Sequence, residues 1–178
     1  MAKKKELDTK NEFILDDWLK SLEKFKLPKI DELPSIDLYM DQVLTYISTT
    51  LKPLIEDDND LTASMINNYV KGKVIKAPNA KKYDRINLAQ LIFISSVKQV
   101  LTIAQIKELL DNDLINHYDQ LIDCESEMLN KTINEISAFM SQSEDNNDKL
   151  MLYKVAVKLA IEAEIKKIVV SKIMESLR

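Results

Sequence analysis

Along most of the chain, apolar residues recur three or four positions apart, which is the spacing of one face of an α-helix. The first such stripe lies in residues 11–26, at Phe13, Ile14, Trp18, Leu22 and Phe25. We expect a helix here, with Trp18 as the core residue that anchors it. Pro28 and Pro34 then predict an extended strap up to residue 36.

Four shorter helices are predicted in the next part of the chain, each preceded by a residue that suits its N-cap. Such a side chain accepts a hydrogen bond from the first turn, and Asp and Thr do this well. The caps and their helices are Asp37 for 37–55, Thr62 for 63–71, Asp84 for 85–101 and Thr102 for 103–110. Gly72, the single glycine of the chain, ends the second of these helices.

The segment GKVIKAPNAKKYD, residues 72–84, separates the second and third of these helices. It contains a short apolar pair, then Pro78-Asn79, then Lys-Lys-Tyr. Turn residues between two short runs predict a small β-hairpin, with its turn at Pro78-Asn79.

Two long helices are predicted at the C-terminus, at residues 113–141 and 149–177. The connector SQSEDNND between them has no apolar residue. The last helix is apolar on most of its sides, which is typical of a central helix or of one at a subunit interface.

Composition agrees with a helical fold. The 178 residues include one glycine and four prolines, far fewer turn residues than an all-β protein needs. One cysteine excludes an intramolecular disulfide and fits a reducing cytoplasm. The sequence has no run of about 18 apolar residues, so we expect no membrane span and a cytoplasmic location.

Charge is concentrated in one segment. Between residues 71 and 85 six cations face a single acid, giving +5, although the whole chain carries −4 and the remainder therefore −9. The cations are Lys71, Lys73, Lys76, Lys81, Lys82 and Arg85. Such asymmetry indicates an anionic partner for the basic segment.

The helix at 63–71 has one row of hydrogen-bonding side chains. If Ile66 and Tyr69 face the core, the exposed row consists of Ser64, Asn67, Asn68 and Lys71. Asn can pair with an adenine edge in the major groove, and Lys can reach guanine or phosphate. The alternative is an ordinary solvated face.

The predicted hairpin could hold such a helix on DNA by clamping the phosphate backbone. The residues assigned to phosphates are Lys73, Lys76, Lys81, Lys82, Tyr83 and Arg85. Tyr83 has a second interpretation, in which it packs under the hairpin. Lysines on a hairpin edge can also serve only to prevent edge pairing.

Residues 61–110 resemble the DNA-binding head of MerR-type regulators. In that family a serine-capped recognition helix carries Leu-Arg-Tyr-Tyr, and Gly-Leu, a wing and two helices follow. Here Thr62 stands at the cap, before MINNYV, KVI, AKKYD and LAQLIFISSVKQVLTIAQIKELL. The family's Arg falls on Asn67, its first Tyr on Asn68 and its Gly on Lys73. The resemblance implies DNA binding by a dimer built on C-terminal helices.

A second resemblance is to the bacterial domain of unknown function 1836. It rests on LPSIDLYMDQV, MINNYVK and LIFISSVKQVLTIAQIKELL and covers residues 30–112. This resemblance implies a fold and no assigned activity.

We expect no metal, no cofactor and no catalysis. His117 and Cys124 lie on one helical face, but a transition-metal site needs three or four ligands. We interpret them as a polar edge residue and a buried thiol. The acidic connector at 56–60 lacks the glycine and spacing of a calcium loop.

The sequence therefore predicts an all-α fold with a small β-hairpin wing. A bracing helix and strap (1–36) precede a MerR-like winged helix-turn-helix (37–111) and a C-terminal helical hairpin (112–178). The hypothesis is a transcriptional regulator that binds double-stranded DNA. Its last helix either forms a homodimer with a second copy or folds back on the preceding long helix to make a closed monomeric bundle. The alternatives are a protein-interaction module that kept the winged fold, and a small-molecule sensor.

Overall fold

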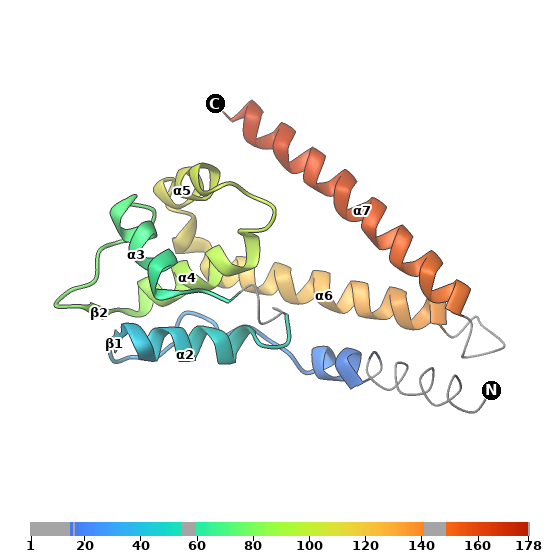
Figure 1. Cartoon of the computed structure of the whole chain (residues 1–178), viewed down its shortest axis with the longest axis horizontal. Helices are drawn as coiled ribbons and strands as arrows, with labels where there is room; N and C mark the ends of the chain where they lie inside the picture. The colour runs from blue at the N-terminus through green and yellow to red at the C-terminus, as the bar shows by residue number, and fades with distance from the viewer. Residues whose placement is uncertain (1–14, 16, 55–59, 141–148, 178) are drawn as a thin grey trace. The chain divides into compact units, whose positions relative to one another are not determined.

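A computed structural model describes residues 15, 17–54, 60–140 and 149–177 (Figure 1). These residues are mostly helical and contain one antiparallel sheet of two short strands. The predicted fold class, all-α with a small β element, is confirmed at this level.

The chain forms two compact units. The central unit is Lys26–Ser126, and the terminal unit combines Met1–Phe25 with Glu127–Arg178. The strap and the start of the first long C-terminal helix thus belong to the central unit.

The central unit contains the sheet and all the shorter helices. Its elements are β1 (Leu38–Tyr39), α2 (Met40–Leu51), α3 (Ala63–Lys71), β2 (Lys82–Tyr83), α4 (Arg85–Val97), α5 (Ile103–Asp111), the 3-10 helix η2 (Leu114–His117) and the first turns of α6 (Tyr118–Met140). The helix predicted at 37–55 begins three residues later, because Leu38 and Tyr39 form a strand. Most of the acidic connector lies outside the described residues.

Three of the four predicted N-caps are confirmed by their hydrogen bonds. The Thr62 hydroxyl accepts from Met65 N–H at 3.2 Å, and the Asp84 carboxylate accepts from Asn87 N–H at 2.9 Å. Thr102 accepts in the same way from the N–H three residues on, at 3.3 Å. Asp37 is not a cap, since α2 starts after Tyr39.

Helix α4 is the centre of the core. Every residue from Asn87 to Ser95 is buried, as the apolar centre of this segment predicted. Helices α2 and α5, strand β2 and η2 all pack against α4. A helix that is apolar on all sides is stable only with such complete cover.

The strap is tied to the start of α6 by three contacts. The buried Tyr118 hydroxyl donates to the Pro28 carbonyl at 3.0 Å, and burial raises the pKa of Tyr118. Asp119 accepts from Ile30 N–H at 2.8 Å, and Lys29 pairs with Asp123 at 3.0 Å. The first two bonds satisfy backbone groups that an irregular segment would otherwise leave unpaired.

The terminal unit combines residues 17–23, which are helical, with the rest of α6 and with α7 (Lys149–Ser176). Leu19 and Leu22 are buried, whereas Trp18 is 46% exposed. The prediction that Trp18 anchors the core is therefore wrong, and the two leucines have that role. Phe13 and Ile14 lie outside the described residues.

Helices α6 and α7 make contact through Lys158. Its ammonium group pairs with Glu135 and lies 5.9 Å from the centre of the Phe139 ring. Val155 on α7 is 9% exposed and Ile133 on α6 is 4% exposed, so both belong to the core.

Candidate nucleic-acid interface

The predicted polar row on α3 is exposed. Ile66 and Tyr69 are 0% and 6% exposed and fix which side of the helix faces the core. The four residues on the other side are all exposed: Ser64, Asn67, Asn68 and Lys71. We call these four the α3 row. Its members carry amide, hydroxyl and ammonium groups that can form hydrogen bonds with a partner.

The end of α3 has an unusual backbone. Gly72 has a φ of −75°, which any residue adopts, whereas Lys73 has a φ of 55°. Lys73 N–H donates to the Val70 carbonyl at 3.0 Å, and Val74 N–H donates to the Tyr69 carbonyl at 2.8 Å. This is a Schellman motif, in which glycine normally occupies the left-handed position. Here a lysine occupies it.

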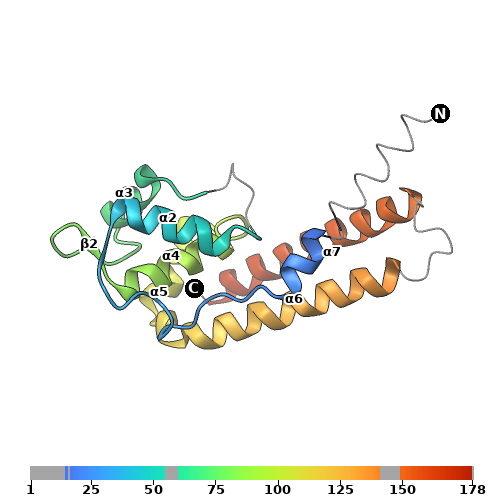
Figure 2. The same cartoon turned by 90° about the horizontal axis from the view of Figure 1, so that it is seen from below.

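A tight turn follows at Ala80-Lys81. Asn79 and Lys82 exchange two backbone hydrogen bonds, of 3.0 and 2.8 Å. Ala80 and Lys81 have φ values of 48° and 65°, so the turn is of type I′, which favours glycine and asparagine. The turn thus lies two residues after the predicted Pro78-Asn79 position. We call residues 72–84 the basic loop; it projects from the central unit in both views (Figures 1 and 2).

Two buried polar side chains of α4 hold the base of the basic loop. Asn87 is 1% exposed, and its Nδ2 donates to the Lys76 carbonyl at 2.9 Å. Gln90 is 9% exposed, and its Oε1 accepts from Lys76 N–H at 3.4 Å. Both backbone groups of Lys76 are therefore fixed by the core.

The strand pairing differs from the predicted hairpin. Strand β2 pairs with β1, whose residues precede α2. Within the segment 72–84 itself, the pairing is limited to the single bridge between Asn79 and Lys82. In the sheet Tyr39 stands opposite Lys82, and the Lys82 ammonium lies 5.0 Å from the Tyr39 ring centre. Tyr39 is 50% exposed.

Sequence reasoning missed Tyr39, because its neighbours show a helical pattern and its partner strand is more than forty residues away. It also missed Lys107 on α5, whose ammonium donates to the Gly72 carbonyl at 3.0 Å. This contact adds a cation beside the end of α3. The pattern of apolar and polar residues along the sequence does not distinguish either position from its neighbours.

Tyr83 is buried at 3% exposure, and this burial raises its pKa. Of its two predicted roles, the structure supports packing under the loop and not contact with a phosphate.

The cations of the basic segment differ in their exposure to solvent and in their ion pairing. Lys71, Lys73, Lys76 and Lys81 are exposed, and Lys82 and Arg85 are partly buried. Lys76 pairs with Asp84 at 3.2 Å, and the Lys76 side chain is still 68% exposed. An exposed pair of this kind is weak and can exchange for another anion.

The structure gives no support for a metal centre in the region it describes. None of the described His, Cys, Asp and Glu residues form a group of three or more that could hold a metal ion. Cys124 is exposed, so the prediction of a buried thiol is wrong. His117 is exposed as well.

In the described part of the chain, the helices are too short or too polar to cross a membrane.

No curated protein and no solved structure matches the chain significantly. A family model does match, over residues 28–132, which is more than half of the chain. This stretch includes the α3 row, the basic loop, the sheet and the core helix α4. The chain belongs to the family described as Domain of unknown function (DUF1836).

Proposed function

We propose that this protein binds double-stranded DNA through a MerR-like winged helix-turn-helix and acts as a non-enzymatic transcriptional regulator. The α3 row enters the major groove, and the basic loop serves as the wing that contacts phosphates. The order of elements supports this reading, since two helices, a turn with a short strand and two further helices follow one another between residues 40 and 111.

The observation that carries the proposal is the strained backbone of the basic loop. Three of the four non-glycine residues with positive φ in the described chain lie between Lys73 and Lys81. A left-handed conformation at a non-glycine residue costs on the order of 1 kcal/mol, and such strain concentrates at functional sites. Two of these three residues, Lys73 and Lys81, are exposed lysines.

Rigidity supports the same conclusion. Loops that only cover a surface are usually mobile, whereas this loop is anchored through Lys76 to Asn87 and Gln90 in the core. A DNA clamp must hold its cations at fixed spacing to set the register of the recognition helix.

The residues divide into two roles. Base contacts are assigned to the α3 row, and phosphate contacts are assigned to Lys73, Lys76, Lys81, Lys82 and Arg85. We add Tyr39, because its ring orients the Lys82 ammonium at the edge of the sheet. Tyr83 is removed from the phosphate set because it is buried.

The α3 row can be tested by selecting duplexes from a random pool and measuring affinity for the selected and for scrambled duplexes. Wild type is expected to prefer the selected duplex. Asn67→Ala with Asn68→Ala should lose this preference, about 10-fold or more, with little change in affinity for scrambled DNA. Asn130→Ala with Asn134→Ala, two exposed asparagines of α6, is the matched control.

One observation favours a protein-interaction module instead. In MerR-type regulators the recognition helix carries an Arg and a Tyr at the positions that Asn67 and Asn68 hold here. The whole chain has only two arginines. If the wild-type protein selects no duplex, the DNA-binding proposal is wrong, and the basic loop is either a solvated edge or a protein-docking surface.

A further inference from the structure

The end of α3 is held by a lysine from another helix. The last carbonyls of an α-helix have no hydrogen-bond partner within that helix. Here the Gly72 carbonyl accepts a hydrogen bond from the Lys107 ammonium of α5 at 3.0 Å. Ile106 and Leu110 of α5 are 0% and 8% exposed, so α5 is itself packed into the core of the central unit. Lys107 is therefore held at the point where the α3 row ends and the basic loop begins.

Three lysines lie next to Gly72. Lys71 and Lys73 flank it in the sequence and are exposed, and Lys107, which contacts its carbonyl, is half-buried. Within the described residues, no carboxylate pairs with any of these three lysines. Like charges that lie close together without a counter-charge repel each other and attract an anion. The lysines at the end of α3 therefore favour an anionic ligand.

The backbone at Lys73 supports a role for its charge. Lys73 has a φ of 55°, a left-handed conformation that is strained for residues other than glycine. Glycine at this position would relieve the strain but would also remove the charge. The Gly72 carbonyl belongs to the peptide bond that leads into Lys73, so the Lys107 ammonium lies beside the Lys73 backbone. The two side chains can therefore reach one ligand from adjacent points.

We propose that Lys73 and Lys107 together bind one phosphate group at the end of α3. An ammonium group has three N–H donors, and the Gly72 carbonyl uses one of those of Lys107. The others remain for phosphate oxygens, which lysine binds as a compact charge. This inference rests on the proposed function, in which the phosphate belongs to the DNA backbone. Because the two lysines share one phosphate, Lys107 strengthens the contact already assigned to Lys73.

The shared phosphate gives the interface a fixed point. Phosphate contacts set the register of a protein on the duplex, provided that the contacting groups are themselves held in place. Lys107 links the phosphate to α5, and the backbone of Lys76 links the basic loop to Asn87 of α4. The α3 row thus enters the groove beside a phosphate whose position is set by the core of the central unit.

Fluorescence anisotropy of the full chain with the selected and the scrambled duplexes tests this site. Lys107→Gln removes the charge, keeps an N–H donor and should weaken both complexes about 5-fold, on the scale of an exposed ion pair. The preference for the selected duplex should persist, because a phosphate carries no sequence information. Lys107→Arg should restore most of the affinity. Lys52→Gln, at the exposed C-cap of α2, is the matched control and should leave it unchanged, and circular dichroism checks that all three variants are folded.

Two results would overturn the inference and leave the proposed function standing. In one, Lys107→Gln has no effect. In the other, it removes the preference without weakening the scrambled complex, which would show that Lys107 only positions α3.

If wild type binds no duplex, the proposed function fails, and NMR titration with inorganic phosphate decides the site separately. The amide signals of Gly72, Lys73 and Val74 should shift with phosphate and not with chloride at equal ionic strength. Lys107→Gln should abolish this shift. The absence of a phosphate-dependent shift in wild type would contradict the inference.

Discussion

Helices α4 and α7 are both apolar around most of their circumference, yet their surroundings are opposite. In α4, all residues from Asn87 to Ser95 are buried by other elements of the central unit. In α7, the large apolar side chains Val157, Ile161 and Ile165 are each more than half exposed. An apolar composition therefore does not by itself show whether a helix is buried by other elements of its own chain.

The same contrast separates two exposed surfaces. The α3 row carries polar groups on a helix whose other side is packed in the core. The exposed side chains Val157, Ile161 and Ile165 of α7 are apolar. The first surface can therefore form hydrogen bonds, whereas the second can contribute only apolar contact area.

The largest expected effect tests this contrast through cavity formation. Leu91 in α4 is 0% exposed, so Leu91→Ala should lower the free energy of unfolding by about 3 kcal/mol. Ile161→Ala should lower it by less than about 1 kcal/mol, because the Ile161 side chain is 56% exposed. Urea titration measures both free energies of unfolding. Equal losses would show that Ile161 is buried in the folded protein.

A second comparison concerns polar contacts. Asn87 is buried and makes bonds both to the Asp84 N–H and to the Lys76 carbonyl. Asn87→Ala should cost about 2 kcal/mol, because it takes away the buried partner of the Lys76 carbonyl and removes part of the cap. Glu135→Gln, which breaks the exposed pair between α6 and α7, should leave the unfolding midpoint unchanged within error. The reverse order would contradict our assignment of the two contacts.

The third prediction tests the strain in the basic loop. Lys73→Gly should raise the free energy of unfolding by about 1 kcal/mol, because glycine adopts the left-handed position without steric cost. Gly72→Ala should change it by no more than about 0.5 kcal/mol. At position 72 φ is already negative, and an added Cβ would lie 3.2 Å from the Asn68 carbonyl oxygen, its nearest neighbour. Thermal or urea unfolding of both variants measures these changes. A loss of stability in Lys73→Gly, or a larger gain in Gly72→Ala, would contradict the assignment of strain to Lys73.

The smallest effect is a pH dependence from Glu125. Burial raises the pKa of this carboxyl, against a weaker opposite effect of its bond with Ser96. The folded state therefore binds the proton more tightly, so its contribution to stability is present at low pH and is lost as pH rises through the folded pKa. Glu125→Gln should flatten this decline between about pH 4 and 7 in urea midpoints. A wild-type curve that rises in this window and is unchanged by the substitution would contradict the assignment.

Local signals predicted much of the fold. Thr62, Asp84 and Thr102 cap helices because a cap depends only on the next three residues, and the buried centre of α4 follows from its unbroken apolar run. The α3 row followed from the positions of Ile66 and Tyr69 in a single helical turn.

Long-range features could not be predicted in this way. Strand β1 looks like the start of a helix until β2, which is far away in sequence, pairs with it. The left-handed backbone falls on Lys73 although a glycine stands beside it. Trp18 and Cys124 are exposed because burial depends on neighbours from other elements, which periodicity within one helix does not contain.

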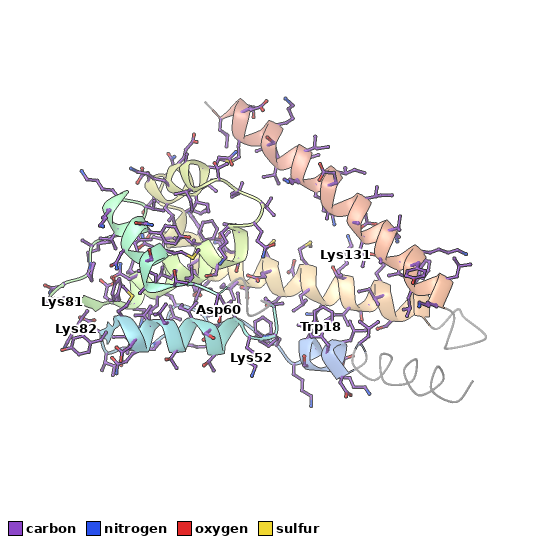
Figure 3. The ribbon with its side chains drawn as sticks, viewed as in Figure 1. Trp18, Lys52, Asp60, Lys81, Lys82 and Lys131 are labelled. Carbon is purple, nitrogen blue, oxygen red and sulfur yellow. The ribbon has the colours of Figure 1, made fainter. Side chains whose placement is uncertain are left out.

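The measurement that tests the central claim most directly is the salt dependence of duplex binding. Figure 3 shows Lys81 and Lys82 at one end of the central unit and Lys52 at the far end of α2. Lys81→Glu with Lys82→Glu removes two proposed phosphate contacts, and Lys52→Glu with Lys131→Glu makes the same charge change at exposed positions outside the proposed interface.

Fluorescence anisotropy of a labelled duplex gives the slope of log affinity against log salt. Five phosphate contacts predict a slope of about −4.5 for each chain, and the loop variant should be shallower by about 2. The control variant should keep the wild-type slope. If wild type does not bind at low salt, or if both variants change the slope equally, the basic loop does not clamp DNA.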